Sequence, residues 1–318
     1  MLRTPNKNRI LCPTLVASLS VLILISALLV KPIIILCVKE QIKKAVGADR
    51  VFIRDCHLRF FHSIFFYDVQ IHRQKDFDIS AKEISVGFNP WLMMVGASAD
   101  RFINDLHLSN LAVHLNSFNF DLENGTLLIS RKTPGVLLID KIQWGNWIMH
   151  KIKSIVRLDK QKLFFKPLSA EMYNGLIDGD INITIEKEPE YSALFNFNNL
   201  DLADFVDAFK LNEKVKIQGL LTGNLVLNGR GKNFKILNGN FYSGRQGGDV
   251  IINDTQFLKR LVTQSNQSAD FLMESLKNYH YNVGDIKLSM DQGAAVLEIN
   301  LNGETGKRNF QIRLHNFF

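Results

Sequence analysis

The chain contains one uncharged segment, residues 11–30, whose length and composition match a membrane-spanning helix. About twenty apolar residues in a helix cross the hydrocarbon core of a bilayer. Twelve of these twenty residues are Leu, Ile or Val. At about −0.4 kcal/mol each they contribute roughly −5 kcal/mol to insertion and offset the Ser, Thr and Pro among them. We therefore expect a single anchor at 11–31, with everything after it folded beside a membrane.

The residues before this segment predict its orientation. Arg3, Lys7 and Arg9 precede it, and no acidic residue does. Lys and Arg hold the flank of a first span in the cytoplasm, so we expect a cytoplasmic tail at 1–10 and the bulk of the chain on the far side. A cleaved signal peptide is the alternative, but the apolar run is longer than a usual signal core and no Ala-x-Ala-like site follows. The sequence before Cys37 also lacks the small residue of a lipoprotein cleavage site.

A short amphipathic helix is expected at 32–47. Pro32 starts it and Gly47 is a suitable stop. One face carries Ile34, Val38, Ile42 and Ala45. Such a helix lies at the membrane surface or plugs one end of the domain that follows.

Composition excludes several classes of function. The net charge is +7, but the basic residues are scattered and do not alternate with aromatics, which argues against nucleic acid. The charge fits either anionic lipid headgroups or simple solubility. Of three cysteines, Cys12 lies in the anchor, so only Cys37 and Cys56 could pair outside it, and their spacing fits neither a disulfide framework nor a zinc site. We expect no metal and no cofactor.

After Gly47 the dominant pattern has a period of two, which is typical of strands with one apolar face. Near 65–72 it predicts Phe65, Tyr67, Val69 and Ile71 on the face opposite Phe66. The clearest case is 215–228, read as one strand. Pairs such as Asn124-Gly125 and Asn174-Gly175 suit hairpins or bulges. We count roughly fifteen strands, mostly neighbours in sequence, and expect an antiparallel meander.

Helices are few and short, and they are expected to cover an open end or edge of the sheet. Capping residues predict them at three places. The expected helices carry Leu202, Phe205 and Phe209 after Asp201; Phe257, Leu258 and Leu261 after Asp254 or Thr255; and Phe271, Leu272 and Leu276 after Ser268, with a brief turn at Trp91 to Val95.

The predicted fold class is mainly β: an N-terminal transmembrane helix, then a long curled antiparallel sheet that forms a groove with a few short capping helices. A β-sandwich with a sealed core is the alternative. The shortage of helices and the predominance of long aliphatic side chains favour the groove. The residues expected to line it and face lipid are Ile177, Ile181, Ile183, Ile185, Phe195, Phe197, Val215, Ile217, Leu221, Leu225, Leu227, Ile286, Leu288, Leu297, Ile299 and Leu301.

Several segments resemble the AsmA-like family of bacterial envelope proteins, which includes TamB, YhdP and YdbH. They are 170–175 with Gly179, FNFNNLDLADFVDAF at 195–209, GLLTGNLVLNGRG at 219–231, 237–241 and the closing hairpin at 275–303. The N-terminal layout of span, Pro32, short helix and Phe-rich strand is also similar. The resemblance implies an N-terminal part of the groove at 48–160 and an AsmA-like C-terminal part at 161–318.

The resemblance also implies function. It implies an inner-membrane anchor, a periplasmic groove and passage of phospholipid between the inner and outer membranes. The chain is shorter than the larger family members, so we expect an envelope partner, an oligomer or a loading role at the inner membrane. An assembly scaffold for envelope or outer-membrane proteins, without lipid conduction, is the alternative.

An enzyme would need convergent polar groups, and the sequence offers little. Asp178 and Asp180 alternate on one strand face, but such a pair is more often a solvated face. The histidines lack metal-ligand spacing, and Gly229-Arg-Gly231-Lys lacks the spacing of a phosphate-binding loop. We therefore expect no catalytic residues.

Overall fold

The computed structural model describes residues 31–314 except 60, 61, 75, 97–101, 117, 118, 160, 185, 187, 232, 245, 255, 257–261, 266–268 and 293. The predicted tail at 1–10 and the predicted anchor, apart from Lys31, lie outside these residues. So do Ile185, Ser268 and the expected helix around 257–261. None of the helices in the described part of the chain has the length and apolar character to cross a membrane.

The described chain is mainly β, with few helices. Residues 31–46 are helical and are called the N-terminal helix below. The other helices are α2 (Pro90–Met94), α4 (Leu202–Ala208) and α6 (Ala269–Ser275). A small sheet contains β12 (Val215–Ile217), β15 (Gly248–Ile252) and β17 (Tyr279–Tyr281). The large sheet contains β1 (Arg50–Phe52), β2 (Asp55–Arg59), β3 (Ser63–Arg73), β4 (Phe77–Phe88), β5 (Ile103–Leu115), β6 (Phe120–Ser130), β7 (Gly135–Trp144), β8 (Trp147–Asp159), β9 (Lys162–Met172), β10 (Gly175–Thr184), β11 (Glu190–Asp201), β13 (Leu220–Arg230), β14 (Asn233–Ser243), β16 (Val262–Ser265), β18 (Val283–Asp291), β19 (Ala294–Gly303) and β20 (Gly306–Leu314).

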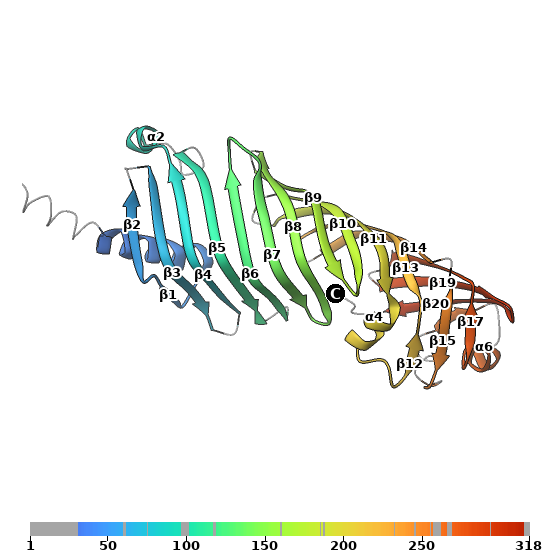
Figure 1. Ribbon diagram of the computed structural model, residues 1–318. Helices are drawn as coiled ribbons and strands as arrows, with labels where there is room; N and C mark the ends of the chain where they lie inside the picture. The colour runs from blue at the N-terminus through green and yellow to red at the C-terminus, as the bar shows by residue number, and fades with distance from the viewer. Residues whose placement is uncertain are drawn as a thin grey trace, which may run out of the picture.

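The large sheet is an antiparallel meander, as the sequence predicts. β1 and β2 both pair with β3, and pairing then runs in chain order from β3 to β11. β13, β14, β18, β19, β20 and β16 complete the sheet. The predicted curl is at most weak, because the sheet twists along its length without curling strongly (Figure 1). Neighbouring strands are rotated by about 20–25° each, so a long meander develops twist along its axis.

The side-chain alternation of β3 differs from the prediction. Phe66 and Val69 lie in one buried cluster, with Ile64 and Ile71 packed against it. The cause is Asp68, whose positive φ of 47° shifts the alternation by one residue. Residues with positive φ also interrupt four other long strands, at Asn110, Asn124, Lys151 and Asn199.

The strand expected at 215–228 is two strands. β12 belongs to the small sheet and β13 to the large one. Gly219 separates them with a φ of 132°, a conformation that L side chains rarely adopt. A Cβ atom there would lie 2.4 Å from the Tyr281 hydroxyl and 2.9 Å from the carbonyl oxygen of Gly247. The chain therefore passes from one sheet to the other at a point where only glycine fits.

The predicted start of α4 is confirmed. The Asp201 side chain accepts a hydrogen bond from the backbone N–H of Ala203 at 2.8 Å, which satisfies one of the unpaired donors at the helix start. Val206 of α4 is buried, and Phe205 packs against the same cluster. α6 buries Leu272 and leads to the buried Leu276 as predicted, but the prediction that Phe271 shares this apolar side is wrong, because Phe271 is exposed. The expected turn after Pro90 is α2.

Candidate functional site: an apolar face along the large sheet

One face of the large sheet carries an almost unbroken row of apolar side chains. Residues that are direct cross-strand partners share a face. Successive partners from β3 to β20 are Phe66, Ile84, Leu108, Leu127, Leu137, Ser154, Leu168, Gly179, Phe195, Leu225, Gly239, Leu288, Leu297 and Ile312. At about 4.8 Å between strands, this row is about 60 Å long. That is about four times the roughly 15 Å of hydrocarbon in one bilayer leaflet.

The interruptions in this row do not break its apolar character. Ser154 is buried, and its hydroxyl donates a hydrogen bond to the Pro167 carbonyl oxygen at 3.0 Å. Gly179 and Gly239 present no side chain beside the large Phe195 and Leu225. A hydroxyl that is already paired and two glycines impose no polar barrier along the face.

The positive-φ residues keep the face continuous. In β6, Leu122 and Leu127 both lie on the apolar face, paired with Ile142 and Leu137, although five positions separate them. Strict alternation would have put Glu123 on this face instead. The left-handed conformation of Asn124, with φ of 53°, shifts the pattern and returns the next apolar side chain to the same side.

The N-terminal helix covers one end of the face. Its side chains Ile34, Ile35, Val38 and Ile42 pack against Phe66, Val69 and their neighbours in β3 and β4. Figure 1 shows this helix lying across the first strands of the sheet. The apolar stripe expected at 32–47 therefore does pack on the β domain, except that Ala45 is exposed.

The small sheet covers the other end and encloses an apolar cavity of about 220 Å³. The cavity lies between β12, β15 and β17 on one side and the apolar face of β13, β18, β19 and β20 on the other. Its walls include Leu211, Ile217, Leu221, Ile252, Ile299 and Phe310. A cavity of about 150 Å³ with a similar lining holds benzene, so this space is large enough for an apolar guest.

Polar groups at this cavity are already hydrogen-bonded. The Tyr281 hydroxyl donates to the Gln218 carbonyl oxygen at 2.9 Å, and burial raises the pKa of Tyr281 to about 12. Ser243 accepts a hydrogen bond from the backbone N–H of Gly284 at 2.8 Å. Both side chains line the cavity without offering it an unpaired polar atom, which keeps it suited to hydrocarbon.

An aromatic cluster borders the face where α4 meets β8 and β9. The Trp147 ring lies 5.8 Å from that of Phe205 and 5.4 Å from that of Phe209, and Tyr173 lies 5.7 Å from Phe205. The Tyr173 hydroxyl donates to the Asn146 carbonyl oxygen at 3.1 Å. Burial raises the pKa of Tyr173 to about 12, so it stays neutral at physiological pH. Edge-to-face rings of this kind fix the position of α4 over the edge of the sheet.

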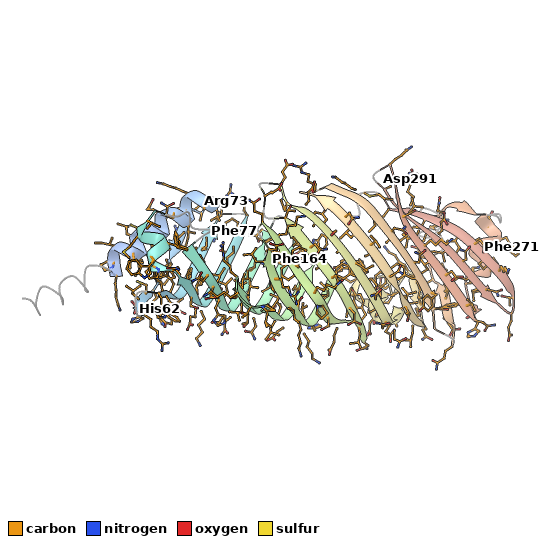
Figure 2. All side chains as sticks on the ribbon, turned by 90° about the horizontal axis from the view of Figure 1, so that it is seen from above. His62, Arg73, Phe77, Phe164, Phe271 and Asp291 are labelled. Carbon is orange, nitrogen blue, oxygen red and sulfur yellow. The ribbon has the colours of Figure 1, made fainter. Side chains whose placement is uncertain are left out.

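Figure 1 shows no helix over the face at β5 to β7, whereas strands of the C-terminal part lie behind β8 to β10 in this view. Figure 2 shows side chains projecting on both sides of the sheet over its length, from His62 near one end to Phe271 near the other. Leu108, Leu127 and Leu137 are half-buried, whereas Ser154, Leu168 and Ile177, on the same face at β8 to β10, are buried. The face is therefore lined by hydrocarbon along its length and is partly exposed at β5 to β7.

The structure brings most of the predicted lining residues together on this face. Those on the large sheet are Ile177, Ile181, Ile183, Phe195, Phe197, Leu221, Leu225, Leu227, Ile286, Leu288, Leu297, Ile299 and Leu301. Val215 and Ile217 lie instead on β12, where they line the cavity from the small sheet. Sequence reasoning missed the N-terminal half of the face, because the shifts in alternation at Asn110 and Asn124 hide its pattern.

The opposite face of the sheet is mixed and more polar. Asp178 and Asp180, weighed above as a carboxylate pair, lie there, where Lys166 binds Asp180 at 2.6 Å and Asn198 donates to Asp178 at 3.4 Å. Hydrogen bonds with Asp121 and Asn116 raise the pKa of the exposed His114 imidazole. In the part of the chain that the structure describes, no group of three His, Cys, Asp or Glu side chains could hold a metal ion.

These features define a class: a mainly β protein built on one elongated antiparallel sheet, with a long apolar face that is covered at both ends and partly exposed at β5 to β7. A family model described as "Intermembrane phospholipid transport protein YdbH" matches residues 108–313. The chain belongs to this YdbH-like family, in agreement with the resemblance to AsmA-like proteins. Comparison with curated proteins and with solved structures gave no match. The family is one of lipid transport proteins, and its name points to intermembrane phospholipid transport.

Proposed function

We propose that the apolar face binds the acyl chains of phospholipids, and that the chain takes part in moving phospholipid between the inner and outer membranes. The observation that carries this proposal is the row of cross-strand partners from Phe66 to Ile312, which is lined by hydrocarbon and partly exposed at β5 to β7. The matching family, with its name, supports the same reading.

The physical basis is the hydrophobic effect. Each methylene group that leaves a bilayer for water costs about 0.8 kcal/mol, so ten of them cost about 8 kcal/mol. A face of half-buried leucine and isoleucine side chains shields one side of an acyl chain and removes a large part of this cost. The headgroup stays in water at the margin of the face, so no charge has to be buried.

The location is part of the proposal. The segment at 11–31, which is uncharged through residue 30, anchors the chain in the bacterial inner membrane with residues 1–10 in the cytoplasm, which leaves 32–318 in the periplasm. The apolar face then starts near that membrane, and an envelope or outer-membrane partner completes the path.

Native mass spectrometry of the full chain, released gently from detergent, tests the proposal. We expect retained mass that corresponds to one or more phospholipids, and lipid extraction should recover diacyl species. A chain that carries no lipid and co-purifies with an outer-membrane protein would overturn the proposal and favour the assembly scaffold instead.

A further inference from the structure

The connection between β4 and β5 displays large apolar side chains that are exposed in the part of the chain that the structure describes. Among the described residues, the large apolar side chains with the greatest exposed fractions are Val95 at 76%, Trp91 at 74% and Met94 at 67%. All three belong to α2 or follow it directly. Figure 1 shows α2 standing beyond the ends of β4 and β5, clear of the body of the sheet.

The α2 connection is held in place locally. The Asn89 side chain accepts a hydrogen bond from the backbone N–H of Trp91 at 3.0 Å, and the N–H of Val95 donates to the Trp91 carbonyl oxygen at 3.2 Å. The backbone N–H of Asn89 also bonds the Phe102 carbonyl oxygen at 2.7 Å. These hydrogen bonds fix the backbone around α2, and Trp91 is exposed there. A contact through Trp91 therefore costs little conformational entropy.

Positive charge lies beside this tip. The neighbouring β6–β7 connection contains Arg131 and Lys132, both exposed, and the N–H of Arg131 donates to the Asn104 carbonyl oxygen at the start of β5 at 3.1 Å. The β6–β7 connection, residues 131–134, contains no carboxylate, and the β4–β5 connection carries one acidic and one basic residue, Asp100 and Arg101, outside the described residues. An apolar tip with flanking cations is complementary to the interface of an anionic bilayer, where Trp is enriched and Lys and Arg contact phosphate.

The predicted membrane anchor identifies the bilayer that lies nearest to α2. The uncharged segment at 11–30 ends where the N-terminal helix begins. Lys31 lies at the edge of the sheet, with Nζ 3.5 Å from Asp55 and its carbonyl oxygen 3.6 Å from the sulfur of Cys56. These residues are in β2, which neighbours β3 and, through it, β4. Lys31, which directly follows the apolar segment in the sequence, and α2 therefore lie at the same end of the sheet.

We propose that α2 docks into the interface of the membrane that holds segment 11–30, with Trp91 and Met94 at the level of the headgroups and Arg131 and Lys132 on anionic phosphates. This contact holds the first strands of the large sheet against the bilayer surface. It does not depend on lipid binding by the apolar face.

Quenching of tryptophan fluorescence by brominated lipid tests this inference on the full chain in vesicles of brominated phosphatidylcholine and phosphatidylglycerol. We expect partial quenching in the natural chain and loss of most of that quenching in Trp91→Phe. The matched control is Trp144→Phe, because Trp144 is also exposed, at 42%, but ends β7 at the opposite edge of the sheet, so quenching should persist. Equal quenching in Trp91→Phe and the natural chain would overturn the proposal.

Two further arms separate the contributions. Bromolipid bound to the apolar face would quench Trp147, so Trp147→Phe reports on the proposed function independently of Trp91. Replacing phosphatidylglycerol with unbrominated phosphatidylcholine should lower the quenching of Trp91, as should the double change Arg131→Gln and Lys132→Gln. If quenching of Trp91 is the same after the change of lipid and after the double substitution, the electrostatic part of the contact is refuted.

Discussion

Replacing Leu225 by Asp is expected to weaken phospholipid binding by at least about tenfold. Leu225 lies on the apolar face of β13, between Phe195 of β11 and Gly239 of β14. A carboxylate placed among acyl chains costs about 2.5–3.5 kcal/mol on an insertion scale, and 1.4 kcal/mol corresponds to a tenfold change in affinity. Leu225 is half-buried, so access of water reduces this penalty, which is why we give the lower bound. Lipid retained per chain and the rate of lipid transfer between vesicles measure the effect.

The neighbouring position supplies the matched control. Asn224 faces the other side of the same strand, where it is exposed and pairs with Asn196 and Asn240. Asn224→Asp introduces the same carboxylate and should leave lipid binding unchanged. Leu225→Ala, which keeps the face apolar, should lower binding by no more than a few-fold. Equal amounts of retained lipid in Leu225→Asp and Asn224→Asp, with both chains folded by circular dichroism, would show that the apolar face does not bind lipid.

Truncating Leu272 to Ala is expected to destabilise the C-terminal end of the sheet by about 3 kcal/mol. Leu272 of α6 is fully buried in the cluster that also contains Leu276, Tyr279 and Val250. Changes from Leu to Ala at such sites cost about 2–5 kcal/mol, because the lost transfer energy is joined by the cost of the cavity. This cluster joins the small sheet to the large one, so its loss opens the end of the apolar face.

Hydrogen exchange localises this loss. A change of about 3 kcal/mol lowers the protection of the amides in β12, β15 and β17 by about 100-fold. Amides in β5 to β8 pair only with their sheet neighbours and should keep their protection. Glu274→Ala on the exposed side of α6 should change protection by no more than about twofold, since surface substitutions stay near ±0.5 kcal/mol. Unchanged exchange in Leu272→Ala would mean that this cluster does not hold the small sheet.

Local signals in the sequence predict part of this fold well. Asp201, a capping residue before a short apolar pattern, predicts the start of α4. The period-two pattern and the small number of helical patterns predict an antiparallel meander. The apolar side chains of β10, β11 and β19 alternate without interruption over most of their length, so their shared face was visible in advance. The stripe on residues 32–47 likewise identified the side of the N-terminal helix that packs.

The rest depends on backbone conformation that residue type does not specify. Asp68, Asn110 and Lys151 adopt positive φ, whereas most other Asp, Asn and Lys residues of the described chain do not. Residue type alone therefore does not predict which positions adopt this conformation. Each such residue reverses the alternation of side chains that follow it. A prediction that assumes strict alternation along the whole strand therefore assigns part of the strand to the wrong face. The small sheet joins segments far apart in sequence, and only Gly219, within an otherwise continuous pattern, marks the change of sheet.

Site-specific photocrosslinking to radiolabelled phospholipid in growing cells tests the central claim most directly. A photoreactive residue is placed in β6 at Leu122, Glu123, Leu127 or Leu128. We expect lipid adducts at Leu122 and Leu127, on the apolar face, and none at Glu123 or Leu128, although Leu128 is exposed and just as apolar. Adducts of equal yield at all four positions, or at Leu128 in place of Leu127, would contradict an acyl-chain path along this face.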